Sequence, residues 1–447
     1  MGSIGPWGKA RLAPERMMRV PDSNAPAAFR QPSFREALGY WFKLGCLSFG
    51  GPAGQIAMMQ TELVDRKAWI AQAPFLRGLS FATLLPGPEA QQLATYIGWR
   101  LHGTWGGVAA GALFVLPGAA CMLLLSWIAA AYGETKFVGA VFDGLKPVVV
   151  AIVAHAVWRV GKKALTTRQA AALAAMAFAL IHFADVGFPW IVAGAAALGA
   201  LAARGGHAWF AAAGHKAVPG TADMPRGDWG RLAKLTAVFG VLWAVPILTV
   251  VAVFGASPFR DVAELMTKAA FVTFGGAYAV LPYVADAAVN HYAWLSAERM
   301  LDGMALAETT PGPLILVLQY VGYFAGWNAG TANPALAATV AALVATYCTF
   351  LPSFLFILAG APYVEGLHEN KAIAGALGAV TAAVVGVILN LAVFLGQAVF
   401  LPTTGFDALA VAAAIVALAV SIRYAPPIHW LVLAGAAFGL ARVFTGL

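Results

Sequence analysis

Two lysines occupy equivalent places in two related stretches of the chain, and their setting favours the binding of a small anion. Lys43 and Lys268 each lie six residues before a Phe-Gly-Gly sequence, within largely apolar segments. A lysine in such a segment is costly unless it is paired or functional. Two interpretations remain for both lysines: attraction of an anion, or an ion pair within the helix bundle.

Glycine and proline sequences interrupt the apolar segments at four matching places, Phe49-Gly50-Gly51, Phe274-Gly275-Gly276, Pro86-Gly87-Pro88 and Pro311-Gly312-Pro313. Because proline removes a hydrogen-bond donor and glycine turns freely, each interruption should end one half-helix and start another. The N–H groups at a half-helix N-terminus carry partial positive charge and can hold an anion. The alternative is that glycine and proline only let helices pack closely.

Polar side chains beside the interruptions carry hydroxyl or amide donors suited to an oxyanion. They are Ser48, Gln55, Gln91, Thr273, Thr309 and Thr310. For each of them, a hydrogen bond to a neighbouring backbone carbonyl is the alternative. The predicted anion site combines these side chains with the two lysines and six glycines, Gly50, Gly51, Gly87, Gly275, Gly276 and Gly312.

Two carboxylates flank the Pro-Gly-Pro sequences and are candidates for proton coupling. Glu89 directly follows Pro88, and Glu308 lies three residues before Pro311. Burial favours the protonated form of a carboxyl group, and ionisable groups at membrane depth commonly relay protons. Capping of a half-helix, or gating, is the rival role for each.

Composition places the chain in a membrane. Of 447 residues, 61% are hydrophobic and 11% are charged, whereas a soluble domain has about 25% charged residues. Apolar runs such as 107–127, 232–254 and 372–400 are long enough to span roughly 30 Å of hydrocarbon. We therefore predict an all-α polytopic membrane protein.

Several classes of function find no support in the sequence. Three scattered cysteines give no metal motif, and no signature of a cofactor or of a hydrolytic site is present, so we predict no enzyme activity, no cofactor and no metal. The net charge of +8 fits the positive-inside rule for membrane proteins. It does not form the basic, aromatic-rich patch of a nucleic-acid binder. The expected partners are a small anion and the lipid bilayer.

The chain contains an internal repeat. Residues 33–88 align without a gap with residues 258–313, at a constant offset of 225, and 15 of the 56 positions are identical. Matches at tryptophan, proline and charged positions are not what an apolar composition favours. The predicted units are a disordered basic cytoplasmic tail (1–33), an N-terminal repeat (34–204), a cytoplasmic linker (205–231), a connecting transmembrane helix (232–254) and a C-terminal inverted repeat (255–447).

The distribution of basic residues along the chain predicts that the two repeats have inverted topology. The basic tail, the basic loop at 159–168 and the linker should be cytoplasmic, so the single helix 232–254 delivers the second repeat to the outer side. Inverted repeats with broken helices are typical of secondary transporters. Two geometries remain for the broken segments. If they span the bilayer the chain crosses about 13 times, and if they are re-entrant hairpins it crosses about nine times.

These sequences resemble the motifs of the chromate ion transporter family, over a stretch running from Phe34 to Leu447. The resemblance rests on Phe49-Gly50-Gly51-Pro52, Gln55, Trp69, Leu85-Pro86-Gly87-Pro88-Glu89-Ala90 and Gly98, and in the second half on Phe274-Gly275-Gly276, Trp294 and Glu308-Thr309-Thr310-Pro311-Gly312-Pro313. It implies a multi-pass protein of the bacterial inner membrane, of the long two-domain type, with its N-terminus in the cytoplasm.

The resemblance also implies an activity: export of chromate, a tetrahedral oxyanion that resembles sulfate, driven by the proton motive force and conferring chromate resistance. Exchange of chromate for sulfate, and an anion channel of the same architecture, are the alternatives. A homodimer fits only because carriers often pair.

Overall fold

The computed structural model describes residues 30–49, 51–207, 209–210, 229–274, 276–363, 371–402, 405–424 and 426–445. Regular structure in these residues is entirely helical, which confirms the predicted all-α class. Gly50, Gly275, nearly all of the predicted tail and most of the predicted linker lie outside the described residues.

The helices form two layers. The first layer holds the broken segments and the helices that pack on them, since α4 contacts α1 and α3, and α13 contacts α4, α8, α9 and α12. Its elements are α1 (Phe34–Leu47), α2 (Gly51–Gln60), η1 (Thr61–Arg66), α3 (Gln72–Leu84), α4 (Glu89–Tyr132), α8 (Trp229–Phe254), α9 (Phe259–Val272), α10 (Ala277–Asp286), η2 (Ala287–His291), α11 (Ala297–Thr309), η3 (Leu314–Leu316), α12 (Val317–Trp327), α13 (Pro334–Gly360) and η4 (Ala361–Tyr363).

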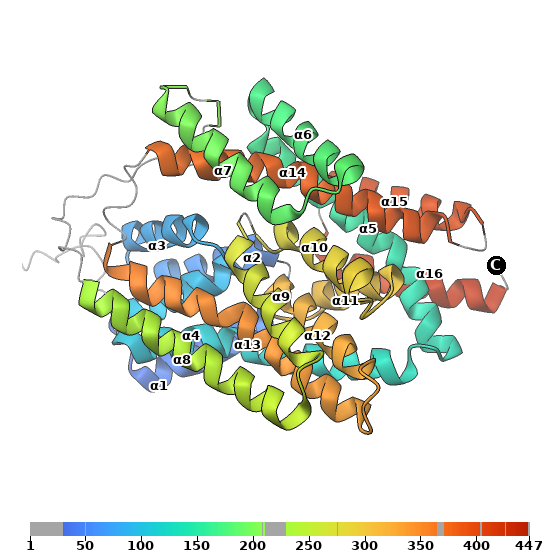
Figure 1. The fold of residues 1–447 in the computed structure, drawn as a ribbon, viewed down its shortest axis with the longest axis horizontal. Coiled ribbons are helices and arrows are strands. Elements are labelled where there is room, and N and C mark those ends of the chain that lie inside the picture. Colours follow the sequence, from blue (N-terminus) through green and yellow to red (C-terminus); the bar gives the residue numbers. More distant parts are fainter. Residues whose placement is uncertain are drawn as a thin grey trace, which may run out of the picture.

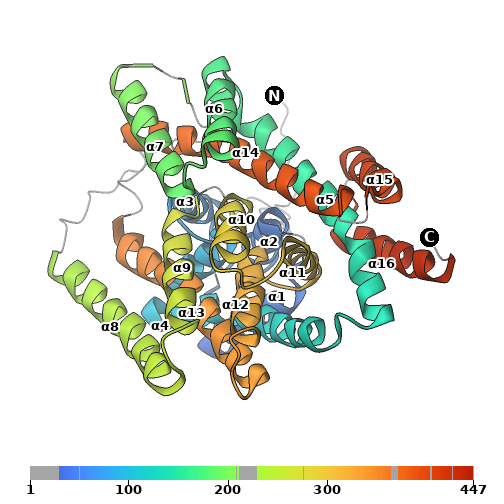
Figure 2. The same cartoon turned by 45° about the vertical axis from the view of Figure 1, so that its right-hand side comes forward.

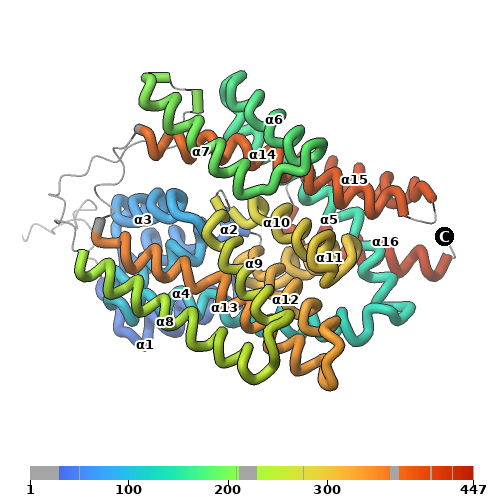
Figure 3. Tube along the Cα trace, in the orientation of Figure 1, coloured from blue at the N-terminus to red at the C-terminus, as the bar shows by residue number. Residues whose placement is uncertain are grey.

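The second layer covers one side of the first (Figures 1 and 2). In it α14 packs against α5, α6 and α7, while α15 and α16 pack against α5. Its elements are α5 (Lys136–Ala164), α6 (Arg168–Ala184), α7 (Phe188–Arg204), α14 (Lys371–Phe400), α15 (Ala408–Tyr424) and α16 (Ile428–Thr445). Figure 3 shows that each layer mixes the two halves of the chain, with green α6 and α7 beside orange-red α14.

The sequence repeat is also a repeat of helix boundaries. Helices α1 and α9 begin and end 225 residues apart, and so do α3 and α11. Helix α4 has non-helical backbone at His102 and Gly103, where the second half of the chain has the loop between α12 and α13. The two parts of α4 therefore correspond to α12 and α13.

In the first half of the chain, the broken segments begin and finish on the same side of the molecule. We call this side the near end. Before α1, the Arg30 N–H donates to the Ala68 carbonyl (3.1 Å) in the loop between η1 and α3. The Phe34 ring packs edge-on against His102 (5.4 Å between centroids), and the His102 Nε2 atom lies 3.0 Å from the Pro32 carbonyl oxygen. These contacts favour re-entrant hairpins over full spans.

The broken helices of the second half gather at another place, beside the far end of α4. The Asn328 side chain, just after α12, donates to the Trp294 carbonyl (2.8 Å) in the loop before α11. From the first turn of α11, the Arg299 guanidinium donates to the Ala129 carbonyl (3.4 Å) in the last turn of α4. The second part of α4 separates this far end from Gly103 at the near end.

Among the described residues, six helices are long and apolar enough to cross a bilayer: Glu89–Tyr132, Lys136–Ala164, Trp229–Phe254, Pro334–Gly360, Ala372–Phe400 and Ile428–Thr445. Helices α6, α7 and α15 are apolar but shorter, with 17 residues each. Large apolar side chains, such as Leu248 and Val253 of α8, are exposed. An exposed apolar surface of this extent requires lipid, and the chain is an all-α polytopic membrane protein.

Candidate functional site

The four interruptions meet at the centre of the first layer through reciprocal backbone hydrogen bonds. The Gly87 N–H donates to the Thr273 carbonyl (2.8 Å), and the Gly312 N–H donates to the Ser48 carbonyl (2.9 Å). Each Pro-Gly-Pro loop of one half is thus tied to the Phe-Gly-Gly break of the other half. The sequence had suggested that the N–H groups of Gly87 and Gly312 bind the anion. Because both groups already donate to backbone carbonyls, they are not free to do so.

Glycine is required at the interruptions by backbone geometry. Gly51, Gly87, Gly276 and Gly312 have φ angles of +80°, +129°, +99° and +93°. L-residues rarely adopt such angles, because the Cβ atom then crowds the backbone. The prediction that these glycines end one half-helix and start another is confirmed for the four that are described.

A cavity of about 610 Å³ lies between the two layers beside the interruptions. Its volume falls within the range of about 300–1,000 Å³ that is usual for ligand sites. The first layer contributes the starts of α2, α4 and α10, and the second layer contributes α14 and the last two turns of α5. The lining residues that carry charge or begin a half-helix are Pro52, Ala53, Glu89, Arg159, Lys163, Gly276, Ala277 and Tyr278.

Positive charge reaches this cavity from two sources. The first N–H groups of a helix have no partner within it, and the starts of α2, at Pro52, and of α10, at Ala277, both line the cavity. From the second layer, Arg159 and Lys163 of α5 line the opposite wall. Their spacing of four residues places both side chains on one face of the helix. The combination suits a small anion with several oxygen atoms.

One of the two predicted coupling carboxylates lines this cavity, and the other contacts a lining residue. Glu89 lines it as the first residue of α4, where its charge also complements the partial positive charge of the helix N-terminus. Glu308 is buried in the last turn of α11 and accepts a hydrogen bond from the hydroxyl of Tyr278, a lining residue. Arg159 lies close enough to Glu308, and Lys163 to Glu89, to interact electrostatically. Each carboxylate therefore lies near a cation that lines the cavity.

The predicted hydroxyl donors are bonded to their own helices. Thr273 donates to the Ala269 carbonyl (2.5 Å) and Thr309 to the Leu306 carbonyl (2.8 Å). Thr310 donates to the Ala307 carbonyl (3.2 Å), and Ser48 lies at the limit of a hydrogen bond to the Gly45 carbonyl (3.5 Å). In the structure each hydroxyl therefore contacts a nearby backbone carbonyl, which was the alternative to binding an anion.

The two predicted amides also stabilise the interruptions. The Gln55 amide donates to the carbonyls of Ser48 (3.1 Å) and Gly312 (2.7 Å), linking the two halves of the chain. The Gln91 amide donates to the Thr95 hydroxyl (3.1 Å) within α4. Neither side chain lines the cavity. Their place is the scaffold that supports it.

The two symmetric lysines do not reach the cavity. Lys43 is exposed on α1. The side chain of Lys268 is 60% exposed and pairs with Glu264 (2.5 Å) one turn away on the same helix, α9. Sequence reasoning assigned Arg159 and Lys163 to a cytoplasmic loop and missed their role as lining residues. Their four-residue spacing at the end of an apolar segment was the available signal.

The fold and the cavity define a membrane protein with a charged central site between two helix layers, built from a repeated set of broken helices. The chain belongs to the chromate transporter family, whose sequence profile matches residues 36–200 and 260–440.

Individual relatives agree with this family. The chain is 34% identical to a chromate transport protein of Pseudomonas aeruginosa over 379 residues, which covers 83% of each chain. It is 29% identical to a chromate transport protein of Cupriavidus metallidurans, covering 84% of this chain and 87% of the relative. A probable chromate transport protein of Synechococcus elongatus is 27% identical, covering 82% and 85%. No solved structure matches the chain.

Proposed function

We propose that this protein is a secondary active transporter that exports chromate across the bacterial inner membrane and thereby confers chromate resistance. The observation that carries the proposal is the cavity between the layers, where the N-termini of α2 and α10 face Arg159 and Lys163. The relatives that are named as chromate transport proteins support the choice of anion. Sulfate has the same tetrahedral shape and charge, so it is the expected competitor.

We assign proton coupling to Glu89 and Glu308. Glu89 lines the cavity and Glu308 accepts a hydrogen bond from the lining residue Tyr278, and each interacts with a cation that would also attract the substrate. An anion and a proton that compete for the same charged groups can be moved in opposite directions by one conformational cycle, because each favours a different charge state of the site. Exchange of chromate for sulfate, without proton movement, is the alternative.

The transport assay uses purified protein in liposomes that contain labelled chromate. Chromate release that follows an imposed pH gradient is the expected result. Release that requires sulfate on the other side and ignores the pH gradient would establish the exchanger instead. Release that ignores both would favour a channel, and no release under any condition would contradict chromate as the substrate. Liposomes containing the Arg159→Gln variant serve as the matched control.

We also propose that the repeats 34–204 and 255–447 are inverted across the bilayer. The support is that the first set of broken helices starts beside Gly103, at one end of α4, and the second set starts beside Ala129, at the other end. Arg66 and Lys67 lie next to Ala68, which the Arg30 N–H contacts at the near end, and basic residues at this end favour a cytoplasmic placement for it and for the N-terminus.

Inversion predicts that equivalent residues are labelled from opposite sides. Asp65 and Asn290 are 225 residues apart, both are exposed, and each lies in the π-helical turn after a broken helix. In a background without Cys46, Cys121 and Cys348, a cysteine at position 290 should react with an impermeant maleimide added outside intact cells. A cysteine at position 65 should react only after the cells are opened. Labelling of both from one side would contradict the inversion.

A further inference from the structure

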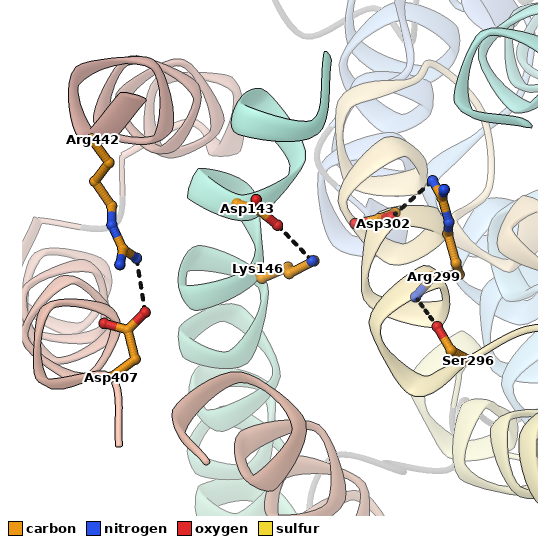
Figure 4. A network of polar contacts seen from close by, with 7 residues as sticks. All are labelled: Asp143, Lys146, Ser296, Arg299, Asp302, Asp407 and Arg442. Atoms are coloured by element: carbon orange, nitrogen blue, oxygen red, sulfur yellow. Dashed lines mark hydrogen bonds and ion pairs between the residues drawn. The ribbon is translucent and has the colours of Figure 1, made fainter. Parts of the chain in front are cut away.

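A second group of charged side chains lies at the far end, where the two layers meet again (Figure 4). Lys146 and Asp143 belong to α5 in the second layer, and Asp302 and Arg299 belong to α11 in the first layer. Helices α5 and α11 are in contact. Figure 4 shows Lys146 directed from α5 toward the helix that carries Asp302. A cavity of about 310 Å³, lined by Asp143, Lys146 and Glu298 among others, opens beside them.

Lys146 and Asp302 are unusually buried for charged residues. The Lys146 side chain is 16% exposed and that of Asp302 is 4% exposed. Each is a principal electrostatic neighbour of the other. Among the described residues, Asp302 Oδ1 has no hydrogen-bond partner. Buried charges are retained only near charges of opposite sign, and across the layer boundary the opposite charge that faces Asp302 is Lys146, without a direct ion pair between them.

Each of the two charges has a second partner on its own helix. Lys146 pairs with Asp143 (2.7 Å), and Asp302 pairs with Arg299 (3.7 Å), in both cases three residues away. If the layers moved apart at this end, neither charge would be left alone, because each would keep the partner on its own helix. A buried charge without a partner is strongly unfavourable, so these inner pairs make separation feasible.

The charge of Asp302 is not repeated at the equivalent position of the first half. The residue equivalent to Asp302 in the first half is Arg77, which carries the opposite charge. The central cavity lies nearer the other end, since it is lined by Arg159 and Lys163 in the last two turns of α5. Lys146, in contrast, lies in the first half of α5.

We propose that Lys146 and Asp302 form an electrostatic latch between the two layers, which holds the far end closed while the central cavity is open toward the near end. The latch opens when the two layers separate at this end, and each charge then keeps the partner that it already has on its own helix. This inference rests on the proposed function only in assuming that the layers move during transport. It assigns control of far-end opening to two residues outside the central cavity.

The test measures accessibility at the far end and needs no substrate. Val399 is buried and lines the far-end cavity, so a cysteine at this position, in a background without native cysteines, reports opening to an impermeant maleimide. Lys146→Gln and Asp302→Asn should each raise the labelling rate about tenfold, the ratio expected for losing one charged contact. The double variant should match the single variants, because both remove one shared interaction.

Two further variants separate a latch from a general structural role. Asp407→Asn breaks the Asp407–Arg442 pair (2.8 Å), which borders the same cavity but lies within the second layer, so labelling should stay within about twofold of the parent. Asp143→Asn removes the competing partner of Lys146 and should lower the labelling rate, because the latch is then strengthened. Since Asp143 is 64% exposed, this variant should fold.

The outcomes distinguish the latch from the transport proposal. Unchanged labelling in Lys146→Gln and Asp302→Asn, or a rise in Asp143→Asn, would overturn the latch, even if chromate transport is intact. If the two buried variants do not accumulate, the direction of the Asp143→Asn effect decides alone. Altered labelling in a protein that does not move chromate would retain the latch and reject the substrate.

Discussion

Arg159→Gln should reduce the rate of chromate transport by about 10- to 100-fold at low chromate concentration. The reason is that Arg159 is one of two cationic side chains lining the cavity, and a hydrogen bond to a charged group contributes about 1.5–3 kcal/mol. A tenfold change in binding corresponds to about 1.4 kcal/mol. The loss should therefore appear mainly as a higher KM, measured as initial uptake or release in liposomes.

The control for Arg159 is its neighbour Lys162 on the same helix. Arg159 and Lys162 are both exposed, but Lys162 lies over the Trp158 ring (5.3 Å to the centroid) and does not line the cavity. Lys162→Gln removes the same charge from the same end of α5 and should leave transport within about twofold of wild type, because Lys162 has no contact with an anion bound there and its longer-range effect is screened by salt. Equal losses in both variants would show that the general charge of this end matters, and not a bound anion.

Glu308→Gln should abolish transport driven by a pH gradient while leaving chromate binding in place. Glu308 is buried beside the cavity, accepts a hydrogen bond from Tyr278 and lies near Arg159. Glutamine keeps the size of the side chain and part of its hydrogen bonding, but it cannot take up and release a proton. The measurement compares chromate movement with and without a pH gradient, at saturating chromate, in the variant and in wild type.

The matched control is Glu264→Gln, a carboxylate of the same half that is exposed and paired with Lys268 (2.5 Å). It should retain the response to the pH gradient. Full coupling in Glu308→Gln would remove Glu308 from the proposed mechanism and leave Glu89 as the coupling group. Loss of chromate binding in Glu308→Gln would instead indicate that the carboxylate supports the position of Arg159.

The two predictions together separate attraction of the anion from coupling to protons. Arg159 and Glu308 come from different layers, so a movement of one layer relative to the other would change the distance between them. A site divided in this way can be loaded on one side of the membrane and unloaded on the other, as alternating access requires.

The amino-acid sequence by itself determined the membrane class, the repeat and the places where helices break. An apolar excess of this size is incompatible with a water-soluble globule, and the Phe-Gly-Gly and Pro-Gly-Pro sequences interrupt helices wherever they occur, because their effect is local to the backbone. The positive φ angles of Gly51, Gly87, Gly276 and Gly312 follow the same local rule. The same reasoning placed Glu89 and Glu308 beside the breaks.

Only the tertiary structure decided which polar groups share one cavity. Equivalent lysines in a repeat suggest a symmetric site, but Lys43 and Lys268 point away from the cavity because their helix faces are turned outward. Arg159 and Lys163 lie more than 70 residues after Pro88, the end of the nearest Pro-Gly-Pro sequence, and they reach the site only because α5 packs across the first layer. Side chains brought together by the packing of distant helices leave no trace in local sequence. The backbone breaks do, because their cause lies within a few adjacent residues.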